Sequence, residues 1–322
     1  MMPGARSGRG GPAVLNILWS ILPIFVLIVL GNVLRRGGIP SIEFWNLNDK
    51  LVYWVLFPSL LFFKTSTTEL AGGFLGPLAA AILTGLAAAL IVSLGLGLAF
   101  GFSRPQATSI LQGAARHNTF LALAISERLF GLEGLAVAAL CTAVLIPPTN
   151  VLVISLMNIL LRHGGPGGLW APVARDLARN PLILSVGLGI GVNFADIGQI
   201  PVIHDATEML GRAALPIVLL AVGANIRINE MKASLSPIAL ATAVKFVVFP
   251  AAVWGMCFTL GITGVTAYVL TVFAVMPMPP SSFTIAREMG GDAPLAASMV
   301  SLQTLLSLLT VPVSLVIAQN LF

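Results

Sequence analysis

The sequence predicts an all-α polytopic membrane protein in which ten transmembrane helices form two inverted five-helix repeats. Of the 322 residues, 57% are hydrophobic and only 9% are charged, whereas a soluble domain carries about 25% charged residues. Two apolar segments, 106–130 and 266–289, are each interrupted near the centre by residues that disfavour a helix. Residues in the two halves also match in order. Paired interrupted segments of this kind are typical of secondary transporters.

Ten apolar runs of roughly 20 residues or more are long enough to cross a bilayer as helices. They lie at 14–34, 46–65, 73–102, 106–130, 134–161, 180–198, 206–226, 233–261, 266–289 and 294–320. The basic start is similar to a signal peptide, but the long run that follows ends in Arg35-Arg36 rather than a small-residue cleavage site, which favours a first span.

The longest connection, 162–179, is rich in glycine and basic residues and lies at the middle of the chain. We expect it to be a hinge loop between a first repeat, 1–161, and a second repeat, 180–322. Asn32 in the first span matches Asn193 in the sixth, at an offset of 161 residues. Two proline pairs follow in order at offsets of 158 and 164 residues: Pro58 with Pro216, and Pro148 with Pro312. Because five spans is an odd number, the second repeat enters the membrane from the opposite side.

The distribution of lysine and arginine predicts the orientation. Ten of these residues fall on the side of the hinge loop and five on the side of the termini. The positive-inside rule therefore places the hinge loop in the cytoplasm and both termini outside, in a cell inner (plasma) membrane. The net charge of +5 comes from residues scattered between apolar runs, so we expect a lipid bilayer and no nucleic acid as a partner. Cys141 and Cys257 lie inside spans and are expected to be buried packing residues.

The two interrupted segments carry the predicted substrate site. Pro277, Pro279 and Pro280 cannot continue an ordinary helix, and lipid offers no partner to the freed backbone groups. A half-helix that begins at such a break presents a positive end that can bind a carboxylate. Side-chain donors at the two breaks are Asn118, Thr119, Ser281 and Ser282. A kink that serves helix packing alone is the structural alternative.

Further polar residues inside the spans are candidates for the same site. Asn150, Gln303 and Thr304 either line the cavity or bond a neighbouring helix. Arg116 either binds a carboxylate through two parallel hydrogen bonds or caps the C-terminus of a half-helix.

Lys245 lies deep in the eighth span, where a charged group is costly and usually functional. It could attract an anion, pair with a half-helix C-terminus, or take the place of a cation that another family binds at this position.

The sequence does not identify the coupling ion. No aspartate or glutamate lies near the centre of a span, so a carboxylate proton relay has no obvious carrier. His117 is the one titratable group there with an ordinary pKa near neutrality, and sodium could be held by carbonyl and hydroxyl oxygens at the breaks. Sodium and the proton are both candidates, and no cofactor and no metal centre are expected.

Five motifs in order resemble those of the auxin efflux carrier family, most closely the bacterial branch described as malonate-transporter-like. They are Arg116-His117-Asn118-Thr119, Pro147-Pro148-Thr149-Asn150, Arg179-Asn180-Pro181-Leu182, Lys245 followed by Pro250, and the prolines before Ala286-Arg287-Glu288. The resemblance implies ten helices in an inverted repeat related to bile acid:sodium symporters, elevator-type motion, and a homodimer.

The same resemblance assigns roles to residues at the breaks. Asn118 matches an asparagine close to the substrate in the plant carriers, and Pro277 to Pro280 match the crossing in the ninth span. This chain lacks the long central loop of the plant carriers and has His117 where they have proline. These departures do not favour auxin itself as the substrate.

The expected function is secondary transport of a small organic anion, such as malonate or another carboxylate, or an auxin-like acid, by alternating access. The alternatives are a sodium-coupled symporter of a larger, bile-acid-like anion and, less favoured, a channel. An enzyme would need a nucleophile–base pair or a metal set, and the three histidines lie on different segments. A sensor would need a soluble output domain, and no stretch of the sequence fits one.

Overall fold

The computed structural model describes residues 13–67, 75–161, 179–226 and 235–322, and every regular element in these ranges is a helix. Within them, six helical stretches are long and apolar enough to span a bilayer: Val14–Arg36, Leu75–Ala99, Arg104–Leu161, Ile203–Ala224, Leu235–Leu260 and Ala293–Leu321. The class of polytopic membrane protein is therefore confirmed. The ten crossings stay a prediction, and the hinge loop, apart from Arg179, lies outside the described residues.

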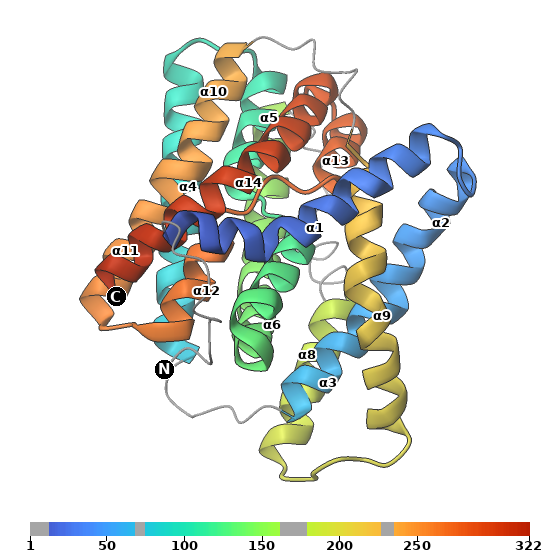
Figure 1. The fold of residues 1–322 in the computed structure, drawn as a ribbon. Coiled ribbons are helices and arrows are strands. Elements are labelled where there is room, and N and C mark those ends of the chain that lie inside the picture. Colours follow the sequence, from blue (N-terminus) through green and yellow to red (C-terminus); the bar gives the residue numbers. More distant parts are fainter. Residues whose placement is uncertain (1–12, 68–74, 162–178, 227–234) are drawn as a thin grey trace.

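The helices form two groups that α1 (Ala13–Arg36) joins by running across both of them (Figure 1). The first group is α2 (Ile42–Leu51), η1 (Val52–Leu56), α3 (Phe57–Thr67), α8 (Pro181–Phe194) and α9 (Ile203–Ala224). The second group is α4 (Leu75–Ala99), α5 (Arg104–Ala115), α6 (Thr119–Leu161), α10 (Leu235–Ala243), η3 (Val244–Val248), α11 (Phe249–Leu260), α12 (Gly264–Ala274), α13 (Ser281–Met289) and α14 (Ala293–Leu321).

Two wide π-helical turns, η1 and η3, have the same cause in the sequence. Each ends two residues before a proline, Pro58 after η1 and Pro250 after η3. Proline has no N–H to donate, and its ring crowds the carbonyl four residues earlier, so the preceding turn widens while the helix continues. Both helices therefore pass their proline without ending, and η3 carries Lys245 into the interior.

Close packing joins α1 to α9. A Cβ atom added at Gly31 would overlap the carbonyl oxygen of Leu220, and one added at Gly223 would overlap that of Ile28. The Asn32 side-chain amide then donates to the carbonyl oxygens of Gly223 at 3.1 Å and Ile226 at 2.9 Å. These bonds fasten α1 to carbonyl groups at the C-terminal end of α9, where intrahelical bonding stops.

A similar contact joins α8 to α3. The Asn193 amide donates to the carbonyl oxygen of Ser66 at 3.1 Å, and a Cβ atom added at Gly189 would overlap the Thr65 hydroxyl. Asn32 and Asn193 are the residues matched between the two halves of the sequence, and each binds the end of a helix in the other half. This likeness supports the inverted repeat, which itself stays a prediction.

The sequence predicts a loop at 131–133, between the fourth and fifth spans, but the structure has a helix with a single kink there. Helical structure runs through α6 from Thr119 to Leu161, and the one residue with a non-helical backbone is Gly131, at φ 63° and ψ −147°. Glycine reaches positive φ without a steric cost, so a single residue redirects the chain where a loop was expected. Pro147 and Pro148 lie within the same helix.

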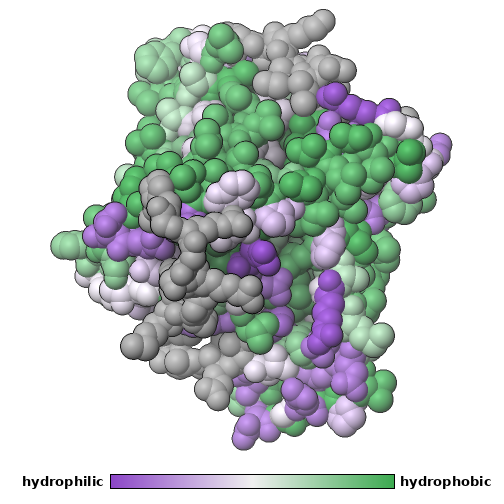
Figure 2. Space-filling view, in the orientation of Figure 1, coloured by the Kyte–Doolittle hydropathy of each residue, from purple (hydrophilic) through white to green (hydrophobic). Residues whose placement is uncertain are grey.

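The surface agrees with a membrane environment. Hydrophobic side chains cover much of the visible face around α1, whereas hydrophilic side chains gather toward the end where α8 and α9 lie (Figure 2). Trp19, Val26 and Val29 of α1 are all more than half exposed. An apolar band of this kind is expected where helices face lipid.

Candidate functional site

The fourth predicted span is broken at Arg116, His117 and Asn118. Helix α5 ends at Ala115, and α6 begins at Thr119. The Asn118 side-chain oxygen accepts a hydrogen bond from Leu121 N at 3.2 Å, as an N-cap residue does. The N-terminus of α6 therefore opens directly beside Arg116.

The ninth predicted span is broken at residues 275–280, between α12 and α13. Pro277, Pro279 and Pro280 lie in this stretch, where the loss of their N–H groups prevents a continuous helix. The two breaks touch, because Asn118 N donates to the carbonyl oxygen of Pro277 at 2.8 Å. The sequence located both breaks, and the structure brings them together.

A cavity of about 640 Å³ lies beside this crossing. The broken helices and the middle of α6 contribute the larger part of its polar lining, which we call the polar wall: Arg116, His117, Asn118, Thr119, Thr149, Asn150, Ser281 and Thr284. Helices η1, α8 and α9 contribute mostly apolar residues, which we call the apolar wall: Val52, Tyr53, Trp54, Leu182, Val218, Ala221 and Val222. The volume lies in the range of pockets that bind small molecules.

Arg116 is the centre of the polar wall. Its Nη1 donates to the Asn150 side-chain oxygen at 3.0 Å, and its Nη2 donates to the Ser281 hydroxyl at 3.3 Å. The residue is only 9% exposed, and its Nε has no hydrogen-bond partner among the described residues. A buried guanidinium held by two neutral acceptors keeps its charge available for an anion.

Several other groups on this wall have no partner within the described part of the chain. They are Asn118 Nδ2, Thr149 Oγ1 and both ring nitrogens of His117, and all three residues are buried. Buried polar atoms normally form hydrogen bonds, so a group of unused ones around one cavity indicates that a polar ligand or water completes it.

The cavity is electropositive. Its lining includes Arg116 and Lys50, and no aspartate or glutamate is among the described residues that line it. Together with the N-terminus of α6, these charges favour an anion over a cation.

Some predicted site residues lie outside the cavity lining. Ser282 is fully buried, and Thr304 donates within its own helix to the carbonyl oxygen of Val300 at 2.7 Å. Gln303 is fully buried and bonds backbone groups of both breaks, so it contributes to the crossing rather than to the cavity surface. Of the prolines, Pro279 and Pro280 line the cavity, whereas Pro277 does not.

Lys245 also lies outside the cavity lining. It is fully buried in η3, and its Nζ lies 4.9 Å from the centre of the Phe249 ring. Within the described ranges the ammonium has no hydrogen-bond partner. Its positive charge can raise the electrostatic potential at the crossing, but its side chain does not line the cavity.

We predict that Lys245→Met stabilises the protein. A buried charge without a partner is unfavourable, and replacing buried charges with apolar side chains of similar size gains about 1–4 kcal/mol in favourable cases. The midpoint of thermal unfolding in detergent should rise by a few degrees, whereas the same change at the half-buried Lys64 should have little effect. A fall in the midpoint would mean that the ammonium is paired in the membrane by an ion or water.

Several residues that line the cavity were not predicted from the sequence. Thr149 is adjacent to the predicted Asn150, so its position in the same motif was the available signal. Lys50, Asn180 and Asn225 lie near helix ends that only the folded chain brings to the cavity. Tyr53 and Trp54 sit in η1, where nothing in the local pattern distinguished them from lipid-facing residues.

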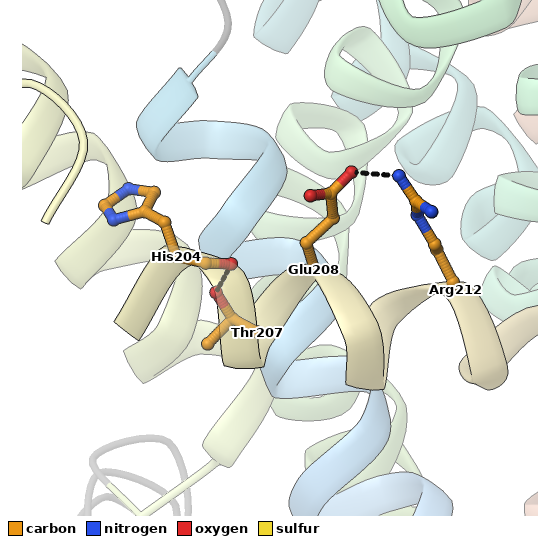
Figure 3. Close-up of polar contacts among 4 residues, drawn as sticks. All are labelled: His204, Thr207, Glu208 and Arg212. Atoms are coloured by element: carbon orange, nitrogen blue, oxygen red, sulfur yellow. Dashed lines mark hydrogen bonds and ion pairs between the residues drawn. The ribbon is translucent and has the colours of Figure 1, made fainter. Parts of the chain in front are cut away.

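Both ring nitrogens of His204 have partners inside the protein, so we do not assign it to the binding site. Its Nδ1 accepts from Ile200 N at 2.9 Å, and its Nε2 lies 3.0 Å from the Ser66 hydroxyl. Figure 3 shows the same stretch of α9, where Thr207 bonds the His204 carbonyl oxygen and Glu208 pairs with Arg212 at 2.6 Å. Both ring nitrogens are thus engaged, and the residue is structural.

Comparison with known proteins identifies the class to which this site belongs. Residues 170–315 match the family described as membrane transport protein. Together with the two relatives below, this match supports a transporter of the auxin efflux carrier family. A protein described as an uncharacterized transporter from Methanothermobacter thermautotrophicus is 22% identical over 300 residues, 91% of this chain and 95% of the relative. Another uncharacterized transporter, from Methanocaldococcus jannaschii, is 23% identical over 298 residues, 90% of this chain and 95% of the relative.

These matches support a multi-pass membrane transporter, and the matched family and both relatives are described as transporters rather than enzymes. The archaeal relatives match both halves of the chain, which include the two breaks. The cavity at the crossing is therefore the candidate site at which this transporter binds its substrate.

Proposed function

We propose that the protein is a secondary transporter of an organic anion and that it binds the carboxylate at the crossing. The observation that carries this proposal is the buried Arg116 guanidinium, which lies beside the N-terminus of α6 in a cavity without acidic lining residues among those described. A carboxylate there would accept from Arg116, from Asn118 Nδ2 and from the first amide groups of α6. Thr119, Thr149, Asn150 and Ser281 complete the polar wall.

The apolar wall supports a substrate with a hydrophobic body. A carboxylate as small as malonate would use little of a cavity of about 640 Å³. A larger amphipathic anion would place its acid group at Arg116 and its hydrophobic part against Tyr53, Leu182 and Val222. This feature favours the bile-acid-like alternative, or an auxin-like acid, over the smallest dicarboxylates.

The proposed transport cycle is elevator-type alternating access in an inverted repeat, as a homodimer in the cell inner membrane. The tight α1–α9 and α3–α8 contacts support a rigid scaffold against which the broken helices move. The lining reaches Lys50 and Asn180, which are on the predicted cytoplasmic side, so we assign this conformation to the inward-facing state. Lys245 would add positive potential behind the crossing, and sodium and the proton are the candidate coupling ions.

A thermal-shift experiment tests the proposal with purified protein. Malonate, indole-3-acetate and cholate below micelle concentration are compared with the neutral indole-3-acetamide, in sodium and in potassium buffer. We expect at least one carboxylate, and not the amide, to raise the unfolding midpoint. The shift should be lost in Asn118→Ala and kept in Asn320→Ala, which changes an exposed asparagine at the end of α14.

Each outcome of the thermal-shift experiment has a definite meaning. A requirement for sodium would identify the coupling ion. If the neutral amide stabilises the protein as well as the acid does, or if no carboxylate shifts it in either buffer, the anion proposal is wrong.

A further inference from the structure

We propose that Gln303 is a positioning residue that holds the two broken helices in register at the crossing, rather than a ligand of the substrate. This inference rests on the proposed function for its consequence in transport, but the bonds that carry it are independent of any substrate. Gln303 belongs to α14, a helix without a break, and is fully buried outside the cavity lining.

Both polar atoms of the Gln303 side-chain amide form hydrogen bonds with backbone atoms. Its Oε1 accepts from Met278 N at 2.9 Å, and its Nε2 donates to the carbonyl oxygen of Gly113 at 3.2 Å. Met278 lies in the second break, and Gly113 lies in the last turn of α5, just before the first break. One side chain thus satisfies a donor from one interrupted helix and an acceptor from the other.

These backbone groups are among those that a broken helix leaves without intrahelical partners. Met278 N lies in non-helical backbone, and the Gly113 carbonyl lies in the final turn of α5, where carbonyls have no later amide to bind. Lipid offers neither group a partner. A glutamine is suited to both because it carries a donor and an acceptor on one rigid group.

Close packing keeps Gln303 within reach. A Cβ atom added at Gly113 would lie 2.7 Å from the sulfur of Met299, one turn before Gln303, and 3.1 Å from the Cβ of Ala241. Glycine lets α5 approach α14 and α10 this closely, because a methyl group there would press on the Met299 thioether and on the Ala241 methyl group. Gly113 and Gln303 are therefore two parts of one contact.

The direct bond from Asn118 N to the Pro277 carbonyl, at 2.8 Å, lies next to this contact in the sequence. Gln303 therefore fixes Met278 while its neighbour Pro277 holds Asn118. Loss of the Gln303 bonds would displace Asn118 Nδ2 from the polar wall although Gln303 itself never touches the cavity.

Hydrogen–deuterium exchange of the purified, full-length protein without substrate tests the inference. Gln303→Met keeps the size of the side chain and removes both bonds. We expect exchange at the Met278 amide to become at least tenfold faster, while exchange in α4 and α9 is unchanged. Gln303→Glu keeps an oxygen for Met278 N and should restore slow exchange at that amide.

Gln112→Met is the matched control. Gln112 is also fully buried, on the same helix as Gly113, but neither of its amide atoms has a partner in the described residues. Its replacement should leave the exchange of Met278 as in the wild type. Gly113→Ala provides a second route to the same result if Gln303→Met does not fold, because its methyl group would press on the Met299 and Ala241 side chains at this contact without changing Gln303.

The outcomes separate this inference from the proposed function. Unchanged exchange at Met278 in both Gln303→Met and Gly113→Ala would overturn the positioning role, whatever the substrate. If exchange rises as expected, indole-3-acetate, malonate and cholate are titrated against Gln303→Met and Asn118→Ala singly and together. A double variant no weaker than Asn118→Ala supports action through Asn118, whereas losses that multiply would mean that Gln303 binds the ligand directly. If no wild-type titration shows binding, the proposed function fails while the exchange result still stands.

Discussion

Arg116→Gln is expected to weaken carboxylate binding by roughly 10- to 100-fold. Hydrogen bonds to a charged group contribute about 1.5–3 kcal/mol, and 1.4 kcal/mol corresponds to a tenfold change in affinity. Glutamine retains polar atoms near Asn150 and Ser281 but removes the charge and the paired donors. The measurement is a titration of the ligand that gives the largest thermal shift, by calorimetry in detergent.

Arg104→Gln is the control for the Arg116 variant. Arg104 is an exposed arginine at the start of α5, where its Nη1 donates to the carbonyl oxygen of Leu160 at 3.2 Å. This variant should bind the ligand as the wild type does. Equal affinity in Arg116→Gln and the wild type would remove Arg116 from the site and leave the half-helix amides to account for binding.

Gly223→Ala is expected to be among the most destabilising single-methyl changes in the chain. The new Cβ atom would overlap the backbone carbonyl oxygen of Ile28, and a backbone atom cannot move aside as a flexible side chain can. Overpacking of this kind costs about 1–3 kcal/mol and sometimes more. The separation of α1 from α9 would also lengthen the Asn32 hydrogen bond to the Gly223 carbonyl.

Gly255→Ala is the matched control, because Gly255 also lies inside a helix but no atom lies within 4 Å of an added Cβ. Alanine there should be neutral or stabilising by roughly 0.5–1 kcal/mol, since glycine is unfavourable in a helix interior. The midpoints of thermal unfolding of the two variants are compared in the same detergent. Equal midpoints would show that α1 and α9 separate at little cost and are not parts of one rigid scaffold.

The sequence was sufficient to predict the class and the two breaks. The scarcity of charge requires a membrane, and both the three prolines within 277–280 and the polar run at 116–118 disfavour a continuous apolar helix. Asn118, Arg116 and Ser281 could be named for the same reason, because polar groups at such a break need partners.

The roles of Gln303 and Lys245 could not be predicted from the sequence. A buried glutamine in an apolar helix is compatible with a cavity wall or with a contact between helices, and only the folded chain shows that it binds Gly113 and Met278. Lys245 lies in the π-helical turn η3 and is fully buried, a placement that the residue type and its position in an apolar run do not specify. The apolar wall was missed because Tyr53 and Leu182 follow the same pattern as residues that face lipid.

Counterflow in proteoliposomes tests most directly the claim that an organic anion is carried through the crossing. Vesicles with purified protein are loaded with an unlabelled carboxylate selected by thermal shift, and entry of the same labelled compound is followed in the wild type, Asn118→Ala and Asn320→Ala. We expect saturable uptake that the internal carboxylate accelerates, that is lost in Asn118→Ala and that is kept in Asn320→Ala. Uptake that rises linearly with concentration, or that is unaffected by Asn118→Ala, would contradict this claim.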